Sequence, residues 1–495
     1  MMQVSNYEII IPFDDEKHYL LVNGLYVAMD VVDTAVGEAM LEGNLKALPD
    51  DERGRLLARG HITDSPETER EDLDIFAGLH RKLAAGRSLC LYILPTYNCN
   101  FRCPYCYEKH RLSAGEDWLK KAMSREMVDA VFEAVDKEKA RGVRIDRIGL
   151  YGGEPLLKEN IELIRYISKK AAVAAMELTV TTNGYDLDIF IDILTKYKYN
   201  KLQITLDGVR EDNDSRRIYS GGGGSYEKIL QNAGLALSKG IQTDIRINVG
   251  PANLERVHAL PRIFEERGFF RYPKFSYYFA PTSGENYPGK DHGVKYSDLV
   301  DMLTRNGFEK NDAMMHVSQY NAVYGEIRNL IKSRKYFNPS DSFCGAESGM
   351  LLADPEGFLY TCWDFVAMDH MRVGRINTGK GKFAFNFELL KWHTRTVDRM
   401  PECAGCPYVF ACRGGCASMA FENTGDLTAY YCGENREIFR EAAKEACQEV
   451  YNKTGERELT RSLKDKTASY TIEERKDLRL SRDPGRLMEL LKKQK

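Results

Sequence analysis

The most constraining feature of this 495-residue sequence is a strand–helix alternation that runs from residue 88 to residue 281. Short apolar runs rich in β-branched residues alternate with stretches whose apolar residues recur at helical spacing. The runs are 88–96, 147–155, 176–184, 201–208, 243–250 and 273–281. Apolar strands separated by amphipathic helices favour a parallel sheet covered by helices. The sequence therefore predicts an α/β fold, either an open doubly wound sheet or a barrel, with its first helix over 118–135.

Short motifs follow the first four predicted strands directly. They are a cysteine triplet, "GGEP" at 152–155, "TTNG" at 181–184 and "TLDG" at 205–208. Because ligands gather at the carboxyl ends of parallel strands, we expect all four motifs on one rim. There, Gly152 and Gly153 would let the backbone approach a ligand closely, and Glu154 would accept a hydrogen bond from a cation such as an amine.

The triplet, Cys99, Cys103 and Cys106, has one thiol fewer than a soft metal usually takes from a protein. A structural zinc site has four protein ligands, and a conventional iron–sulfur cluster is held by four thiolates. An open position suggests that something other than the protein binds there. A zinc knuckle that borrows a distant histidine is the alternative.

Cysteine usage indicates metal binding rather than disulfides. The chain shows neither a signal peptide nor an apolar run of ~18 residues, so we expect a reducing, cytoplasmic location and no membrane partner. A net charge of -3 gives no reason to expect nucleic acid. Ten of the twelve cysteines fall into two groups. Cys90 and Cys447 stand alone, and we interpret them as small buried hydrophobic residues.

The second cysteine group is larger. It comprises Cys344, Cys362, Cys403, Cys406, Cys412, Cys416 and Cys432. Seven thiols can ligate one iron–sulfur cluster fully and a second incompletely. Spacing alone does not separate iron from zinc, so zinc in the run 403–416 remains an alternative.

The Cys-x3-Cys-x2-Cys triplet after the first strand, with "GGEP" after the second, resembles the radical S-adenosylmethionine (SAM) enzymes. The resemblance implies a partial (β/α)6 TIM-like barrel in which the three thiolates hold a [4Fe-4S] cluster and SAM completes it. Electron transfer from the cluster would then yield a 5′-deoxyadenosyl radical, which takes a hydrogen atom from the substrate.

The same resemblance implies roles for residues along the rim. Tyr105 would lie against the adenine, Gly152, Gly153 and Glu154 would bind the methionine amino group, Thr205 would contact the ribose or carboxylate, and Arg217 would bind the carboxylate. The planar fork of an arginine suits a carboxylate. Related sequences often have His-Asp where this chain has Asn213-Asp214, so Arg216 is the alternative to Arg217.

The larger cysteine group resembles, in register, the seven-cysteine SPASM extension of these enzymes, which implies two auxiliary [4Fe-4S] clusters. By that resemblance Cys403, Cys406, Cys412 and Cys432 hold an outer cluster, and Cys344, Cys362 and Cys416 hold an inner one. Relatives with a closed inner cluster often carry an eighth cysteine just before the first, and "KYFNPSDSFC" has none there. Either Cys447, a histidine or water completes the inner cluster, or a substrate thiolate does.

The first 85 residues have a different pattern. Two β-rich runs, 7–13 and 18–24, predict a hairpin, and helical segments are predicted within 31–43 and 50–64. This loosely resembles the small winged-helix-like α+β domain with which maturases of ribosomally synthesised peptides (RiPPs) hold a precursor's leader as an added strand. An ordinary α+β packing domain is the alternative.

The complete division predicted for the chain has four parts. Residues 1–85 form the leader-recognition domain, 86–310 the barrel, 311–450 a bridging region with the SPASM domain, and 451–495 a charged helical tail.

These resemblances imply an enzyme that matures a precursor peptide and draws electrons from a donor such as flavodoxin or ferredoxin. Our hypothesis is oxidative formation of a thioether between a cysteine thiol and a carbon of another residue, with the thiolate bound by an open iron of the inner cluster, which accepts the electron. Asp364 is a candidate acid or base. The alternatives are carbon–carbon crosslinking, oxidation of Cys or Ser to formylglycine on sulfatases, and a metal-stabilised binding protein without catalysis.

Overall fold

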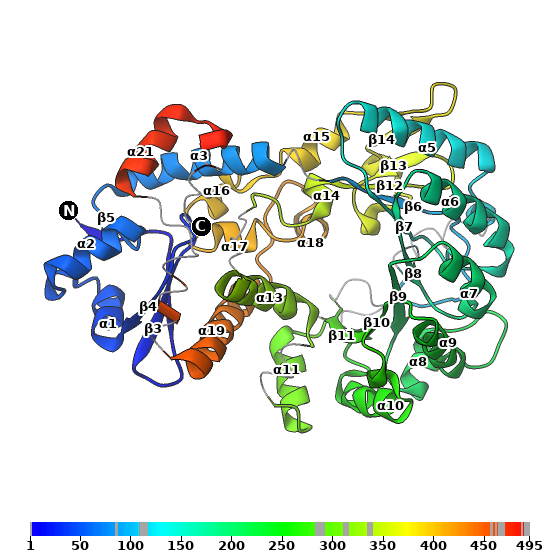
Figure 1. The fold of residues 1–495 in the computed structure, drawn as a ribbon, viewed down its shortest axis with the longest axis horizontal. Helices are drawn as coiled ribbons and strands as arrows, with labels where there is room; N and C mark the ends of the chain where they lie inside the picture. The colour runs from blue at the N-terminus through cyan, green and yellow to red at the C-terminus, as the bar shows by residue number, and fades with distance from the viewer. Residues whose placement is uncertain are drawn as a thin grey trace. The chain divides into compact units, whose positions relative to one another are not determined.

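A ten-stranded, mostly parallel sheet forms the centre of one of the two compact units in the computed structural model (Figure 1). The structure describes residues 2–84, 88–106, 108, 117–282, 293–309, 316–333, 340–455, 459–460, 463, 471–486 and 489. The unit with this sheet, here called the barrel unit, comprises 87–318 and 345–392. The other, here called the terminal unit, comprises 1–86, 319–344 and 393–495.

Six consecutive parallel strands confirm the predicted α/β fold and its six strands. They are β6 Cys90–Ile93, β7 Arg147–Leu150, β8 Glu177–Thr182, β9 Lys201–Leu206, β10 Thr243–Val249 and β11 Phe275–Pro281, and they lie side by side in that order. The helices after them are α5 Arg125–Ala140, α6 Ile161–Val173, α7 Leu187–Lys196, α8 Arg210–Arg216, α9 Tyr226–Ser238 and α10 Leu260–Glu266, and α6, α7 and α9 run along the outer side of the strands (Figure 1). Since the strands are parallel, their carboxyl ends share one rim.

The first helix of this series begins later than predicted. The predicted stretch 118–135 divides into a short 3-10 turn, η2 Asp117–Lys120, and α5, which begins at Arg125. Ser124 causes the division because its side chain accepts a hydrogen bond from the Met127 backbone N–H at 3.1 Å, as an N-cap does. The buried face of α5 is consequently built from Val128, Val131, Phe132 and Val135.

Four further strands, which sequence reasoning did not predict, extend the sheet beyond β6. Their bounds are β12 Met350–Ala353, β13 Phe358–Tyr360, β14 Gly374–Asn377 and β15 Lys382–Phe385. β12 pairs with β6 in parallel, and the other three follow as an antiparallel meander. Each of these strands has only three or four residues, too few to show an alternating pattern in the sequence.

Shorter elements complete the barrel unit. These are η3 Lys158–Asn160, η4 Leu254–Ala259, η5 Phe269–Arg271, α11 Tyr296–Arg305, α14 Gly345–Ser348, η7 Trp363–Phe365, η8 Asp369–Met371 and α15 Glu388–His393, which ends at the unit's boundary.

The N-terminal part of the terminal unit is a small α+β arrangement. Its three-stranded antiparallel sheet has the order β2 Glu8–Pro12, β3 His18–Asn23 and β4 Met29–Asp33. The other elements are β1 Gln3–Val4 paired with β5 Ile62–Thr63, α1 Thr34–Glu42, η1 Leu45–Ala47, α2 Asp50–Arg59 and α3 Pro66–Ala84. The hairpin predicted from 7–13 and 18–24 is therefore confirmed. The helix predicted within 31–43 begins only at Thr34, because Val31 and Val32 belong to β4.

A buried ionic cluster lies inside this N-terminal part. The His61 ring is fully buried and lies 2.9 Å from a Glu8 carboxylate oxygen on one side and 2.7 Å from an Asp30 oxygen on the other. Burial alone would lower the pKa of His61, but the two carboxylates raise it to about 9. Arg59 donates a hydrogen bond to the same Asp30 carboxylate at 2.7 Å. The cluster thus pairs its buried charges.

The C-terminal part of the terminal unit is largely helical. Its elements are α13 Ser318–Ser333, η9 Val397–Arg399, α16 Pro401–Ala404, α17 Val409–Cys412, α18 Ala417–Thr424, α19 Asn435–Thr454 and α21 Ile472–Ser481. Part of the predicted tail, 451–495, lies outside the described residues. Among the helices that the structure describes, none is both long and apolar enough to cross a membrane.

Candidate functional site

A cavity of about 550 Å³ at the mouth of the barrel unit brings the four rim motifs together. Its lining includes the predicted site residues Cys99, Cys103, Tyr105, Cys106, Gly152, Gly153, Glu154, Thr205, Arg217 and Asp364, together with Thr181, Thr182 and Asn183 of the "TTNG" motif. The volume is within the range of pockets that hold a small organic ligand, about 300 to 1,000 Å³. The alternative carboxylate ligand, Arg216, is not part of this lining.

The glycine pair holds the cysteine loop against the second strand. The Gly153 N–H donates to the Thr96 carbonyl at 3.2 Å, and the Glu154 N–H donates to the Asn98 carbonyl at 2.8 Å. A Cβ on Gly152 would lie 2.7 Å from the Thr96 oxygen, and Gly152 has a φ of +126°. Glycine is therefore required here because the chain itself approaches closely. Sequence reasoning expected only the approach of a ligand.

Glu154 is a buried carboxylate whose oxygens already have partners in the protein. One oxygen accepts from the Thr182 hydroxyl at 2.6 Å and from the Leu156 N–H at 2.8 Å, and the other accepts from the Asn183 N–H at 2.6 Å. Burial raises the pKa of Glu154 to about 7, although these hydrogen bonds lower it. The contacts fix the direction of the carboxylate within the cavity lining.

Arg217 and Arg216 both pair with the Asp207 carboxylate, at 3.7 Å and 3.0 Å, and both contact Tyr105, but they differ in their access to the cavity. The Arg217 guanidinium lines the cavity and donates to the Tyr105 hydroxyl at 3.2 Å, and its Nε has no hydrogen-bond partner among the described residues. Arg216 donates from its Nε to the Asp207 carboxylate at 3.0 Å, and its guanidinium lies against the face of the Tyr105 ring. Of the two candidates, Arg217 is the one whose side chain lines the cavity.

The cysteine triplet lies on a loop that other parts of the barrel support. The Arg102 N–H donates to the Ile218 carbonyl and the Ser220 N–H donates to the Asn100 carbonyl, each at 2.8 Å. Burial raises the pKa of all three thiols, that of Cys106 to about 12. Metal binding requires thiolates, and a bound metal offsets this cost by deprotonating its ligands. Three thiols, a guanidinium and a carboxylate in one cavity suit a three-thiolate cluster with an amino-acid ligand.

Aromatic and polar residues of the cavity were missed by sequence reasoning. The Trp363 ring packs between Tyr92 and Tyr151, with ring centroids 4.2 Å from each, and so fixes the loop that carries Asp364. Arg246 places a second guanidinium in the lining, from the middle of β10. The available signal for it was a cation between two isoleucines, Ile245 and Ile247, within a predicted strand.

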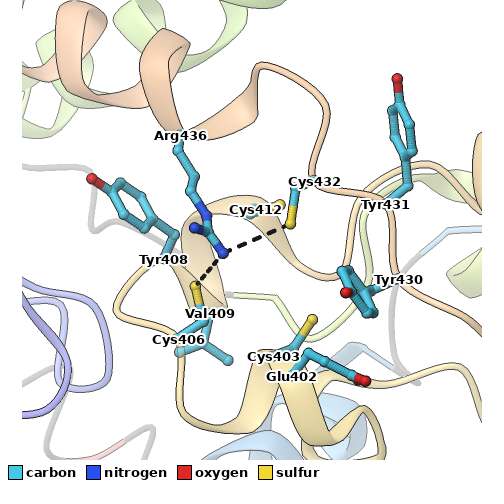
Figure 2. A pocket seen from close by; sticks show the side chains of 11 residues that line it. Glu402, Cys403, Cys406, Tyr408, Val409, Cys412, Tyr430, Tyr431, Cys432 and Arg436 are labelled. Atoms are coloured by element: carbon cyan, nitrogen blue, oxygen red, sulfur yellow. Dashed lines mark hydrogen bonds between the residues drawn. The ribbon is translucent and has the colours of Figure 1, made fainter.

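The four cysteines predicted for the outer cluster line one pocket of the terminal unit. Figure 2 shows Cys403, Cys406, Cys412 and Cys432 facing a common space of about 140 Å³. The Arg436 guanidinium, from α19, lies 3.6 Å from the Cys406 sulfur and 3.7 Å from the Cys432 sulfur (Figure 2). Four cysteines around one pocket supply as many thiolates as a closed iron–sulfur cluster takes.

A buried arginine orders the loops around this pocket. Arg395 donates hydrogen bonds of 2.7 to 3.0 Å to the backbone carbonyls of Gly414, Gly415, Leu427 and Ala429. It is 2% exposed. Because no side chain is needed at the accepting positions, the sequence contains no motif that would reveal this role.

The remaining cysteines are divided between the units. Cys344 and Cys416 belong to the terminal unit and Cys362 to the barrel unit, so the inner-cluster ligand set stays a prediction. Cys447 is fully buried in α19, as predicted, whereas Cys90 is only partly buried, contrary to expectation, because it is the first residue of β6. Within the described part of the chain, no three His, Cys, Asp or Glu side chains converge closely enough to hold a single metal ion.

Comparison with known proteins places this barrel in a family. The profile described as "Radical SAM superfamily" matches residues 93–260. The chain is 31% identical over 165 residues to a GTP 3',8-cyclase of Rhizobium etli (strain CIAT 652), a match that covers 33% of this chain and 44% of that relative, less than half its length. It is 30% identical over 293 residues to a GTP 3',8-cyclase of Clostridium perfringens (strain 13 / Type A), covering 57% of this chain and 84% of the relative.

Longer matches extend beyond the barrel. A cysteine-type anaerobic sulfatase-maturating enzyme of Clostridium novyi (strain NT) is 22% identical over 379 residues, 72% of this chain and 94% of the relative. The solved structure described as "Native anSMEcpe with bound AdoMet" shares the fold, with a TM-score of 0.54 at 19% identity over 76% of this chain and 99% of that one. The family match over residues 93–260 confirms the predicted SAM and its [4Fe-4S] cluster as the family's cofactors. With its cysteine triplet and "GGEP" motif on the shared rim, the chain belongs to the radical SAM superfamily.

Proposed function

We propose that this protein is a peptide maturase that installs thioether crosslinks between cysteine sulfur and carbon in a ribosomally synthesised precursor. The observation that carries the proposal is the single cavity in which the SAM motif residues meet Asp364. Asp364 comes from the segment that also carries Cys362, and the Cys362 sulfur lies 3.9 Å from its carboxylate. The predicted radical chemistry and a predicted inner-cluster ligand are thereby brought into one unit.

Different residues of the cavity bind the cluster, the amino group of SAM and the carboxylate of SAM. Cys99, Cys103 and Cys106 hold the cluster, Glu154 accepts from the amino group of SAM, and the Arg217 guanidinium, which lines the cavity, binds its carboxylate. When bound, SAM and the iron–sulfur clusters supply hydrogen-atom abstraction and electron transfer. The packed rings around Trp363 keep the mouth of the cavity in a fixed shape.

The net reaction removes two hydrogens from the peptide. One is the hydrogen atom of the carbon that is attacked and the other is the thiol hydrogen, while a new C–S bond forms and two electrons leave the peptide. Asp364 is placed to take the proton of the substrate thiol, because its carboxylate lines the cavity. The three thiols predicted for the inner cluster leave one position for that sulfur, which is what favours a thioether over other products.

The terminal unit supports a peptide substrate. Its sheet has the order β2-β3-β4, so β2 and β4 form the edges on which a leader could add as a further strand. The two auxiliary clusters, the electron donor of the flavodoxin or ferredoxin type, the cytoplasmic location and the predicted division into four parts belong to the same proposal.

The test is co-expression with a short cysteine-containing precursor, followed by mass spectrometry. A thioether lowers the mass of the peptide by two hydrogens and protects the thiol from alkylation. A peptide that keeps its mass and its free thiol, from an enzyme that releases 5′-deoxyadenosine with reductant and SAM, contradicts the proposal. An iron-loaded protein that releases no 5′-deoxyadenosine contradicts radical chemistry altogether.

Formylglycine formation is the second candidate because the match to the sulfatase-maturating enzyme spans 94% of that relative. The N-terminal domain argues against it, since sulfatase maturation generally proceeds without one. The same mass measurement separates the two, because formylglycine replaces the sulfur with an aldehyde that a hydrazide probe labels.

A further inference from the structure

The N-terminal sheet domain and the loop of the outer cysteines share one hydrophobic core inside the terminal unit. Its members are Tyr7, Leu25, Tyr26, Leu73, Ile75, Phe76, Ala77 and Leu79 on one side, and Val397, Met400, Cys403, Ala404, Val409 and Phe410 on the other, with Leu478. One of the outer cysteines, Cys403, is itself a buried member of this core. The pocket for the outer cluster is thus built partly on the N-terminal domain.

Two backbone contacts tie the domain to the segment between Cys403 and Pro407. The Tyr7 hydroxyl donates a hydrogen bond to the Ala404 carbonyl. Gly24, next to β3, lies against Pro407 so closely that a Cβ would be 2.8 Å from the Pro407 carbonyl carbon and nearer still to its oxygen. A side chain at position 24 would therefore displace the cysteine loop.

A row of cations on α19 makes a third connection. Arg436 reaches the Cys406 and Cys432 sulfurs, and one turn later Arg440 donates to the Tyr408 hydroxyl at 3.3 Å and to the Ile10 carbonyl of β2 at 3.0 Å. One further turn on, Lys444 pairs with Asp14 at 3.0 Å. Residues at this spacing lie on one helix face, so α19 connects the cysteine pocket to the edge of the sheet.

We infer that Tyr7, Gly24 and Arg440 are positioning residues for the outer cluster, and that assembly of this cluster and folding of the N-terminal sheet are one coupled equilibrium. The inference rests on the outer cluster of the proposed function. A group that binds only the folded form stabilises whatever its ligands are packed against. The outer cluster would thus hold the recognition domain in its folded form.

The first test changes the domain and measures the metal. Gly24→Ala should remove the iron of one cluster, about four of the ~12 irons that three [4Fe-4S] clusters bring, and the electron paramagnetic resonance signal of the outer cluster. Tyr7→Phe is the milder variant if Gly24→Ala does not fold, and it should reduce outer-cluster iron about twofold or more. Gly54→Ala is the matched control, since its Cβ meets nothing within 4 Å.

The second test changes the metal and measures the domain. Hydrogen exchange in residues 8–23 should be about tenfold faster in Cys406→Ala than in the wild type, and unchanged in Cys103→Ala, which removes a ligand of the SAM cluster instead. Exchange in β8 and β9 should stay unchanged in both variants. Equal exchange of 8–23 in the two cysteine variants, or full outer-cluster iron in both Gly24→Ala and Tyr7→Phe, overturns the coupling.

Both measurements omit peptide and SAM, so they leave the thioether proposal untouched whichever way they come out. If reconstituted wild-type protein binds only the iron of the SAM cluster, or zinc at Cys403–Cys432, the proposed function loses its outer iron–sulfur cluster. In that case the inferred coupling between an outer iron–sulfur cluster and folding of the N-terminal sheet is also contradicted.

Discussion

Replacement of Gly153 by alanine tests whether the glycine pair acts through the cysteine loop. Gly153 lines the SAM cavity, but a Cβ at this position would point toward the backbone of Tyr97 and Asn98, just before Cys99. That Cβ would lie 2.7 Å from the Tyr97 carbonyl carbon and closer to the carbonyl oxygens of Tyr97 and Asn98. The atoms in the way belong to backbone, so they cannot rotate aside.

The size of the effect follows from these contacts. Overpacking of this kind costs about 1 to 3 kcal/mol, and separating the two segments weakens the hydrogen bond from Glu154 to Asn98, worth about 1 kcal/mol. If this total of about 2 to 4 kcal/mol falls on the conformation that binds the cofactor, Gly153→Ala should weaken SAM binding about 30-fold to 1,000-fold.

Anaerobic equilibrium binding of SAM to the reconstituted protein measures this prediction. Gly379→Ala is the control, because that exposed glycine lies between β14 and β15 and its Cβ would meet only the Asn377 amide oxygen, at an ordinary 3.8 Å. A Gly153→Ala protein that binds SAM within threefold of the wild type would refute the packing argument and leave direct contact with SAM as the only role of the residue.

Three further predictions concern single side chains. The two carboxylates raise the pKa of His61 from 6.5 to about 9 and so keep its ring charged. This contributes about 3 kcal/mol to the free energy of unfolding, in full below pH 6.5, and the contribution is lost as the pH rises through 9. Equal urea midpoints at pH 6.5 and pH 9.5 would contradict this prediction. Arg217→Lys should weaken SAM binding about tenfold because the guanidinium fork is lost, whereas Arg216→Lys should lower the urea midpoint and leave SAM affinity within threefold. Ser124→Ala should cost about 1 kcal/mol in unfolding experiments through loss of the α5 cap, and an unchanged urea midpoint would count against the cap.

Periodicity was enough to predict a parallel α/β sheet with four motifs on one rim, whereas the choice of a barrel and the candidate roles of Tyr105, Thr205 and Arg217 came from the family resemblance. The predicted strands of 88–281 are rich in apolar and β-branched residues, and the rule that parallel strands end on one side then placed the motif residues together. The later strands β12 to β15 were missed because short antiparallel strands leave little pattern. Arg246 and Trp363 were missed for a different reason. Neither belongs to one of the rim motifs in the sequence, and only the folding of the chain brings them into the cavity lining.

The cysteines show most clearly what a linear pattern omits. In the sequence the ten clustered cysteines form a group of three and a group of seven. In the structure, one member of the larger group lies in the same unit as the group of three. Cys362 belongs to the barrel unit, where its sulfur contacts the Asp364 carboxylate of the SAM cavity, while Cys403, Cys406, Cys412 and Cys432 belong to the unit that contains the N-terminal sheet.

This division suggests that the two proposed auxiliary clusters have different tasks. A ligand that adjoins the cavity can affect chemistry directly, whereas four ligands that close a pocket on the N-terminal domain leave no position for a substrate. Cys362→Ala should therefore abolish crosslinking while residues 8–23 keep their hydrogen-exchange protection, and Cys406→Ala should lose that protection. If both substitutions affected exchange alike, the cysteines would act as one cooperative metal domain, and the separation of tasks between the clusters would be wrong.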